Sequence, residues 1–506
     1  MARIQKIKKN LIFNALKEVT TLLLRFILRT VLIYYMGAEY LGLNGLFSNI
    51  FGFLNLAELG IGSAIVFSMY KPIAENDIEK IKALQNLYKK FYLIISLVIG
   101  IIGLILTPFI PFFMNGGVEA NINIYILYIM YLCYTLVGYW SAHKRSLLFA
   151  YQRNDVENKI KTICMFFMTI LQIVVLVLFR NYYVYFSISI LFAVIECSTI
   201  HISANKLFPR INGKSIPLDD KTKKEIKKNI TALSMHKIGS AVVFSTDNIL
   251  ISTFFGLTAL GVYSNYSLII TTITTFFILI INAIQASIGD LIATANIDYV
   301  YERYKKIRFI FAYLSALTTI CLATLFQPFI LKWTGDSSYL LDTTTVMLIC
   351  VCYYFTRMRS PVGVFKDSAG LFWQGRWSPI VESIVNLGVS IGCAFLCGIN
   401  GIFIGTIVST LVAPFWVEPC VLYKHYFKKS PKKYFLKCLM DFLIMVICGV
   451  VCYFVCSLIP SSDWLLLAIK FVVCFVLANA LLILAYLPTG EILDCIKFIK
   501  NSFFNK

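Results

Sequence analysis

Residues 91–114 read FYLIISLVIGIIGLILTPFIPFFM, a run that contains no Asp, Glu, Lys or Arg. A helix needs about 20 mostly apolar residues to cross the roughly 30 Å of hydrocarbon in a bilayer. This run is therefore long enough and apolar enough to span a membrane once. Because open sheet edges cannot satisfy their backbone hydrogen bonds in lipid, we expect helices throughout such a chain.

The composition of the whole chain agrees with this local reading. Of its 506 residues, 59% are hydrophobic and only 14% are charged, whereas soluble proteins carry about 25% charged residues. The formal net charge of +20 would suggest a nucleic-acid partner in a soluble protein. Here the Lys and Arg residues lie in short segments between apolar runs, as they do on cytoplasmic loops. The composition excludes an ordinary soluble protein and does not call for nucleic acid.

Apolar runs long enough to cross the bilayer recur along the entire chain. The sequence predicts an all-α polytopic membrane protein with about 14 transmembrane helices, near residues 11–36, 40–70, 91–114, 121–148, 160–179, 182–207, 230–255, 259–290, 307–331, 339–367, 379–397, 400–423, 436–459 and 463–487. Alternate connections differ in charge, since one set holds nearly all the Lys and Arg and the other holds only Arg180 and Lys332. Positive residues accumulate on the cytoplasmic side, so both termini are expected in the cytoplasm.

A shift of 219 residues aligns two parts of the chain without gaps. It places residues 8–10 (KKN) on 227–229 and the pattern Gly-x3-Leu-Gly of 37–42 on 256–261. Because six spans separate the copies, both halves enter the membrane in the same direction, which is a parallel repeat. The predicted organisation is an N-lobe (1–208), a basic cytoplasmic linker (209–229), a C-lobe (230–424), an accessory helix pair (436–487) and a cytoplasmic tail (488–506).

Charged residues inside the spans carry the functional information, because an ionised side chain at the bilayer centre costs about 2.5–3.5 kcal/mol. Arg25 and Arg29 are four residues apart and share one helix face with Glu18. Two guanidiniums with one acid leave an excess of positive charge. Such an excess suits a phosphate or pyrophosphate, which guanidinium binds with two hydrogen bonds. We therefore expect Arg25 and Arg29 to bind substrate in a cationic cavity between the lobes.

Other polar residues in the spans extend this prediction. The candidate substrate-binding set is completed by Arg357, Arg359, Asn248 and Asn386, and the candidate ion-coupling or pairing acids are Glu58, Asp247, Glu382 and Glu18. The alternative for each charge is a structural ion pair between helices. Arg359, which lies two residues before Pro361, could also be a snorkelling residue near the cytoplasmic end of its span.

Neither catalysis nor metal binding is indicated. Most of the 15 Cys lie inside apolar runs, no C-x-x-C motif occurs, and only four His are present. Cys448, Cys452 and Cys456 form a small-residue stripe at helical spacing, which favours helix packing. We expect no cofactor, no metal and no catalytic residue, with coupling to the membrane potential, H⁺ or Na⁺ as the open energy sources.

Several motifs together resemble a known family. They are residues 29–46 (RTVLIYYMGAEYLGLNGL), 56–64 (LAELGIGSA), 247–252 (DNILIS), 262–266 (VYSNY), and Glu382-x3-Asn386-x3-Ser390 followed by 398–401 (GING). Their order and spacing resemble bacterial polysaccharide repeat-unit flippases of the Wzx type, in the multidrug/oligosaccharidyl-lipid/polysaccharide exporter (MOP) superfamily.

This resemblance implies a V-shaped, two-lobed transporter, not an enzyme, in the bacterial plasma (inner) membrane. Its cargo would be undecaprenyl-pyrophosphate-linked oligosaccharide repeat units of capsule, O-antigen or exopolysaccharide, moved from the cytoplasmic to the external leaflet by alternating access. Arg25 and Arg29 map by position onto the cationic cavity that the resemblance implies. The implied partners are the lipid-linked glycan, membrane lipid, a polysaccharide polymerase and glycosyltransferases.

Three alternatives remain open at the level of sequence. A flippase for a peptidoglycan lipid precursor would handle the same pyrophosphate. A multidrug or cation antiporter of the same superfamily would favour acidic groups in its cavity, whereas Arg25 and Arg29 would repel cationic cargo. A membrane glycan polymerase or ligase needs acid, base or nucleophile groups on a sizeable external surface, but the external connections are only a few residues long.

Overall fold

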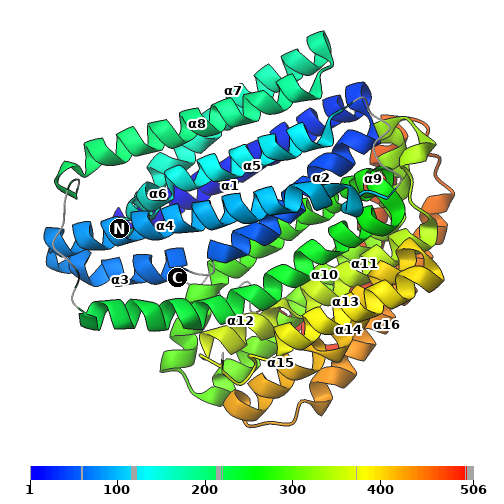
Figure 1. The fold of residues 1–506 in the computed structure, drawn as a ribbon. Coiled ribbons are helices and arrows are strands. Elements are labelled where there is room, and N and C mark those ends of the chain that lie inside the picture. The colour runs from blue at the N-terminus through cyan, green and yellow to red at the C-terminus, as the bar shows by residue number, and fades with distance from the viewer. Residues whose placement is uncertain are drawn as a thin grey trace. The chain divides into compact units, whose positions relative to one another are not determined.

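The computed structural model describes residues 2–58, 61–115, 122–211, 213, 218, 220–371, 373–495 and 497. In these residues the regular structure is helical, and no strand occurs among them (Figure 1). The chain forms two compact units, Met1–Gly261 and Val262–Lys506. The all-α class predicted from the sequence is confirmed.

Unit 1 is a set of packed helices in which α8 is central. α7 packs along α8 and α1, and α5 packs against the same helix α8. The elements are α1 (Ala2–Met36), α2 (Ala38–Leu54), η1 (Asn55–Glu58), α3 (Ile61–Glu75), α4 (Ile78–Leu106), η2 (Thr107–Phe113), α5 (Ile124–Trp140), α6 (Ala142–Ala150), α7 (Asn154–Phe179), α8 (Tyr182–Leu207), η3 (Pro209–Ile211) and the first part of α9 (Asp220–Thr294).

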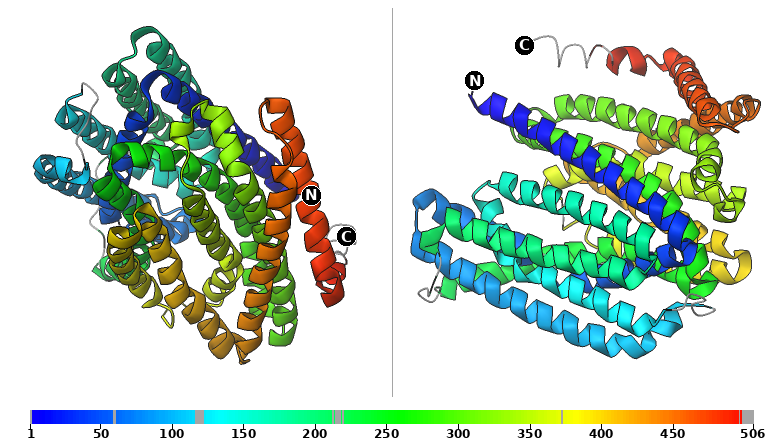
Figure 2. Two further views of the ribbon diagram at one scale, coloured as in Figure 1. Left: turned by 90° about the vertical axis from the view of Figure 1, so that its right-hand side faces the viewer. Right: turned by 90° about the horizontal axis from the view of Figure 1, so that it is seen from above.

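Unit 2 is organised around α10, which packs against α11, α16 and α17. The two C-terminal helices α16 and α17 lie side by side (Figure 2). The elements after α9 are α10 (Ile297–Thr334), η4 (Ser337–Tyr339), α11 (Thr343–Met358), α12 (Ser360–Ser368), α13 (Ser378–Cys397), α14 (Ile399–Val412), α15 (Pro414–Leu422), the π-helical turn η5 (Tyr423–Phe427), α16 (Lys432–Ser457), α17 (Trp464–Tyr486) and η6 (Leu487–Thr489).

Short polar side chains start many of these helices. In five helices, a side-chain oxygen of the capping residue accepts a hydrogen bond from a backbone N–H of the first turn. These caps are Asp77 for α4, Asn123 for α5, Asn181 for α8, Asn296 for α10 and Asp342 for α11. Such a cap satisfies one of the donors that a helix leaves free at its start. The sequence therefore sets the helix starts locally, before any packing between helices is considered.

Eleven helices in the described part of the chain are long and apolar enough to cross a membrane. Large apolar side chains are exposed on their outer faces, for example Leu178 and Phe454 at 68% and 65%, as expected for surfaces that face lipid. Some of the fourteen predicted spans are not continuous single helices. The segment 40–70 is interrupted by η1, and the segment 339–367 is divided into α11 and α12. The segments 230–255 and 259–290 both lie in α9, which has non-helical backbone angles at Gly256, between the two predicted spans.

The internal repeat has a counterpart in backbone geometry. Gly37, between α1 and α2, and Gly256, inside α9, have φ angles of 88° and 83°. These two glycines are the pair that the 219-residue shift aligns. Positive φ is accessible to glycine at little cost, so each copy bends its chain at the same residue.

A close contact connects the same two segments within unit 1. A Cβ atom added to Gly42 would lie 2.0 Å from the carbonyl oxygen of Leu257, and one added to Gly261 would lie 1.9 Å from the carbonyl oxygen of Ala38. Since 38 and 42 become 257 and 261 under the shift, the contact is reciprocal. Only glycine allows the two backbones to approach this closely.

The cysteine stripe of α16 lies in a packed helix surface, as the sequence predicted. Cys448, Cys452 and Cys456 are buried, and the first two belong to the hydrophobic core of unit 2. The described residues contain no group of three His, Cys, Asp or Glu arranged to hold a metal ion. Helices α13 and α14 pack most closely where Gly401 and Gly405 contact Cys393 and Ser390.

Candidate functional site

The first candidate site lies in unit 1, on α1. Arg25 is exposed and Arg29 is half-buried. Arg29 is within electrostatic reach of Tyr185 on α8, and Arg25 is within reach of Tyr134 on α5. Both guanidiniums therefore lie near the helices α5 and α8, and Glu18 is half-buried on the same helix.

A second charged pair lies beside this site and was not singled out from the sequence. Arg145 Nη2 lies 2.9 Å from Glu196 Oε1, and both side chains act electrostatically on Tyr134. Arg145 falls near the end of the predicted span 121–148, among other basic residues, and Glu196 falls within the predicted span 182–207. Because other basic residues lie beside Arg145 in the sequence, its ion pair with Glu196, which connects α6 and α8, was not predicted.

The described side chains named so far in this region carry a net positive charge. They are three guanidiniums, those of Arg25, Arg29 and Arg145, and two carboxylates, those of Glu18 and Glu196. The Arg145–Glu196 pair is internally balanced. One positive charge is left in excess in a helix whose flanking surfaces are apolar.

Glu58 stands at the end of a chain of hydroxyl groups in the same unit. Ser146 Oγ donates to Tyr88 Oη at 2.7 Å, Tyr88 Oη donates to Tyr92 Oη at 3.1 Å, and Tyr92 Oη donates to the Glu58 carboxylate. The chain connects η1, α4 and α6. Hydrogen bonds arranged in series polarise one another, so Glu58 is held by more than its single direct donor.

Arg359 lies in an ion-pair cluster of unit 2. Its guanidinium is 3.6 Å from Glu382 Oε1 and 3.3 Å from Glu418 Oε2, and Lys366 Nζ is 3.2 Å from Glu418 Oε1. Two cations therefore face two acids, which is the ion-pair alternative that the sequence left open. Glu418 was not predicted, because it lies within the apolar run 400–423. Arg357 is half-buried and lies within electrostatic reach of Tyr353.

The predicted asparagines occupy different surroundings. Asn386 is 1% exposed and donates from Nδ2 to Thr406 Oγ1 at 3.1 Å, between α13 and α14. It lies one turn after Glu382 on the same helix. Asn248 and Asp247 are half-buried in α9. The structure thus brings Glu382 together with Arg359, and it places Arg25 and Arg29 beside Tyr134 and Tyr185, whereas the central cavity between the lobes stays a prediction.

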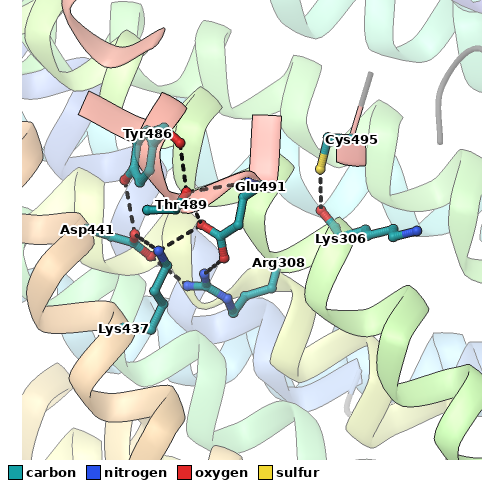
Figure 3. Close-up of polar contacts among 8 residues, drawn as sticks. All are labelled: Lys306, Arg308, Lys437, Asp441, Tyr486, Thr489, Glu491 and Cys495. Atoms are coloured by element: carbon teal, nitrogen blue, oxygen red, sulfur yellow. Dashed lines mark hydrogen bonds and ion pairs between the residues drawn. The ribbon is translucent and has the colours of Figure 1, made fainter. Parts of the chain in front are cut away.

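A further ionic cluster lies in unit 2 among α10, α16 and the end of the chain (Figure 3). Arg308 Nη1 is 2.6 Å from Asp441 Oδ2, and Tyr486 Oη donates to Asp441 Oδ1 at 3.0 Å. Glu491 lies 2.7 Å from Lys437 and 3.8 Å from Arg308. Arg308 falls at the start of the predicted span 307–331, and in the structure it lies inside α10 and is 5% exposed. The cluster is balanced, so it serves to hold α16 and the chain end against α10.

The chain is similar to known proteins in structure. No family model matches the sequence, and no curated protein matches it. Among solved structures, the lipid II flippase MurJ in an inward closed conformation is similar with a TM-score of 0.67 and 14% sequence identity, over 94% of this chain and 99% of that chain.

Two transporters of a second group are also similar. An inward-facing multidrug resistance MATE family transporter of the MOP superfamily has a TM-score of 0.58 at 17% identity, over 79% of this chain and 94% of that chain. The MATE multidrug transporter DinF-BH, in a ligand complex, has a TM-score of 0.56 at 16% identity, over 84% of this chain and 97% of that chain. The chain therefore has the fold that MurJ shares with the MATE transporters of the MOP superfamily.

Proposed function

We propose that this protein is a flippase that moves a polyprenyl-pyrophosphate-linked oligosaccharide, of the kind used for capsule, O-antigen or exopolysaccharide, across the bacterial plasma membrane. The observation that carries the proposal is the excess of guanidinium charge at Arg25 and Arg29, in a membrane-spanning helix beside Tyr134 and Tyr185. The fold of the MOP superfamily supports a transport role for it.

The proposed mechanism follows from the chemistry of the cargo. The guanidiniums of Arg25 and Arg29 bind the pyrophosphate, since each can form two parallel hydrogen bonds to its oxygens. The sugars occupy a hydrated space and the polyprenyl chain stays in lipid, because transferring either to the other medium is costly. Alternating access then exposes the site on the external side. The substrate-binding roles of Arg357, Arg359, Asn248 and Asn386 are part of this proposal.

Two energy sources are compatible with the charges involved. With the cell interior negative, outward movement of two negative charges is favoured by about 4.6 kcal/mol per 100 mV when no countercharge moves. Alternatively, an acid in the spans carries a proton in the return direction. Glu58 is the best placed of the candidate acids, because it ends the hydroxyl chain from Ser146.

A peptidoglycan lipid precursor is the second candidate cargo. The similarity to MurJ extends over 94% of this chain, and that cargo presents the same pyrophosphate to Arg25 and Arg29. A cation antiporter is less compatible, because an excess of guanidinium charge repels cationic cargo.

The test is a flipping assay in proteoliposomes with two fluorescent cargoes, an undecaprenyl-pyrophosphate oligosaccharide and lipid II. The double variant Arg25→Ala, Arg29→Ala is expected to lose at least about tenfold in rate, since each lost charge-assisted hydrogen bond is worth about 1.5–3 kcal/mol. Arg153→Ala is the matched control, because Arg153 pairs with Asp155 at 3.0 Å on the surface. Full activity of the double variant contradicts the proposed site. Faster flipping of lipid II than of the oligosaccharide favours the second cargo.

The proposed orientation, with both termini in the cytoplasm, is tested separately. A green fluorescent protein fused to the C-terminus should fluoresce, whereas alkaline phosphatase fused at the same point should be inactive, because it folds only outside the cytoplasm. Active phosphatase would contradict the orientation.

A further inference from the structure

A cavity of about 240 Å³ lies within unit 2, between α10, α11, α16 and α17. It lies at the end of the unit where α10 ends and α17 begins. Apolar side chains form part of its wall, and the polar residues that line it are Thr324, Gln327, Thr343, Tyr453, Ser457, Ser461 and Lys470. It is separate from the ionic clusters around Arg308 and Arg359.

Lys470 is the only charged residue among the described residues that line this cavity. The residue is 7% exposed, and its Nζ donates to the carbonyl oxygen of Ile459 at 3.3 Å. An ammonium group has three protons to donate. One contact to a neutral carbonyl therefore leaves most of its hydrogen-bonding capacity unused.

No acid in the described part of unit 2 compensates the charge of Lys470. The acids at this end of the unit are engaged elsewhere. Asp336 accepts from Ser338, Asp342 accepts from the backbone of Thr344, and Asp463 lies beside Ser462. A buried charge without a counterion is costly, so an anionic group in the cavity would stabilise the charged form of Lys470.

Helix capping accounts for only part of this arrangement. Ile459 lies two residues beyond Ser457, the last residue of α16, and a cation near the end of a helix interacts favourably with the helix dipole. Lys332 also donates to this loop, from its Nζ to the carbonyl oxygen of Ser462 at 2.7 Å, but it does not line the cavity. Capping therefore does not explain why Lys470 borders an open cavity lined by hydroxyl groups.

The surface around the cavity is apolar. Leu458, Trp464 and Leu465 are 82%, 54% and 73% exposed, which is typical of side chains in contact with lipid. A tryptophan at the start of a membrane-spanning helix marks the level of the lipid headgroups. A phosphate group at that level would lie close to the cavity.

From this geometry we propose that the cavity binds the phosphate group of a membrane phospholipid, with Lys470 as the cationic ligand and hydroxyl groups of the wall as further donors. The acyl chains of the lipid lie on the apolar surface beside Leu458 and Leu465. In the proposed orientation this lipid belongs to the external leaflet. The site is independent of the proposed flippase site on α1, since it uses none of its residues.

The experiment measures lipid binding to the purified, delipidated full-length protein by native mass spectrometry. Phosphatidylglycerol is the probe, and diacylglycerol with the same acyl chains is the control that lacks the phosphate. The wild type should bind phosphatidylglycerol more tightly than diacylglycerol. Lys470→Met should weaken the tightest phosphatidylglycerol binding about tenfold, the effect of one lost charge-assisted hydrogen bond, while Lys332→Met should leave it unchanged.

A second variant guards against a folding defect in Lys470→Met. Thr343→Trp fills the cavity from its exposed rim and keeps Lys470, and it should weaken binding to a similar extent. Equal binding by the wild type, Lys470→Met and Thr343→Trp overturns the proposal. Displacement of bound phosphatidylglycerol by inorganic phosphate, with direct Lys470-dependent phosphate binding, overturns the assignment to lipid in favour of a free anion.

Discussion

The buried pair of Arg308 and Asp441 gives the sharpest prediction for stability. Asp441→Asn removes the carboxylate that lies 2.6 Å from the Arg308 guanidinium while keeping the size of the side chain. The Arg308 side chain is only 6% exposed, so water cannot replace the lost partner. The variant should therefore be destabilised by much more than a surface substitution.

The expected magnitude follows from what remains around Arg308. Removing one partner of a buried ion pair costs about 3–5 kcal/mol, because it leaves an uncompensated buried charge. Glu491, at 3.8 Å, still faces Arg308 and reduces the loss. We therefore expect about 3 kcal/mol, the lower end of that range. The double variant Arg308→Met, Asp441→Leu should be more stable than Asp441→Asn, because it buries neither charge.

The assay is unfolding of the detergent-solubilised protein, followed by tryptophan fluorescence during titration with a denaturing detergent. Glu302→Gln serves as the control, since Glu302 and Lys305 form a pair at 2.7 Å whose side chains are 57% and 48% exposed. Its loss should cost less than about 1 kcal/mol. Equal unfolding midpoints for Asp441→Asn and Glu302→Gln would refute the reasoning, as would a double variant less stable than Asp441→Asn.

Two further predictions concern unit 1. Gly261→Ala should lower the melting temperature by the equivalent of about 1–3 kcal/mol, because its Cβ would lie 1.9 Å from the backbone oxygen of Ala38. Gly52→Ala is the control, since its Cβ meets no atom within 4 Å. Equal melting temperatures for the two variants would contradict the close contact at Gly261. Tyr92→Phe removes the hydroxyl group that donates to Glu58. If Glu58 carries protons, transport driven by a pH gradient should fall, while transport driven by membrane potential alone should persist. An equal effect on both kinds of transport would exclude proton transfer by Glu58.

The membrane fold was predictable because it depends on residue type within short windows. Apolar runs and the asymmetry of Lys and Arg identified the helical class without any tertiary information. The exact division into helices was less predictable. The 3-10 turn after Leu54 and the break between α11 and α12 depend on local backbone conformation, which hydropathy does not register.

The candidate site was partly predictable. The spacing of Arg25 and Arg29 on one helix face indicated their shared position, because helical periodicity is local. Their neighbours could not be predicted, since Arg145 and Glu196 come from separate helices and meet only in three dimensions. The same applies to Glu418, which the sequence shows only as one acid in an apolar run.

The site around Lys470 was not predictable from the sequence. One basic residue six positions after Trp464 attracts no attention in the sequence, because long side chains near helix ends commonly extend to the membrane surface. Its significance depends on the cavity beside it and on the hydrogen-bond partners of the nearby acids.

The reciprocal contact of Gly42 with Leu257 and of Gly261 with Ala38 has a consequence for ancestry. Contacts in which each partner offers the same surface characterise two-fold symmetric dimers. The same contact can form between two separate half-length polypeptides as well as within one fused chain. Gene duplication and fusion of such a homodimer would preserve it, and neither glycine could then diverge without blocking the other copy's backbone.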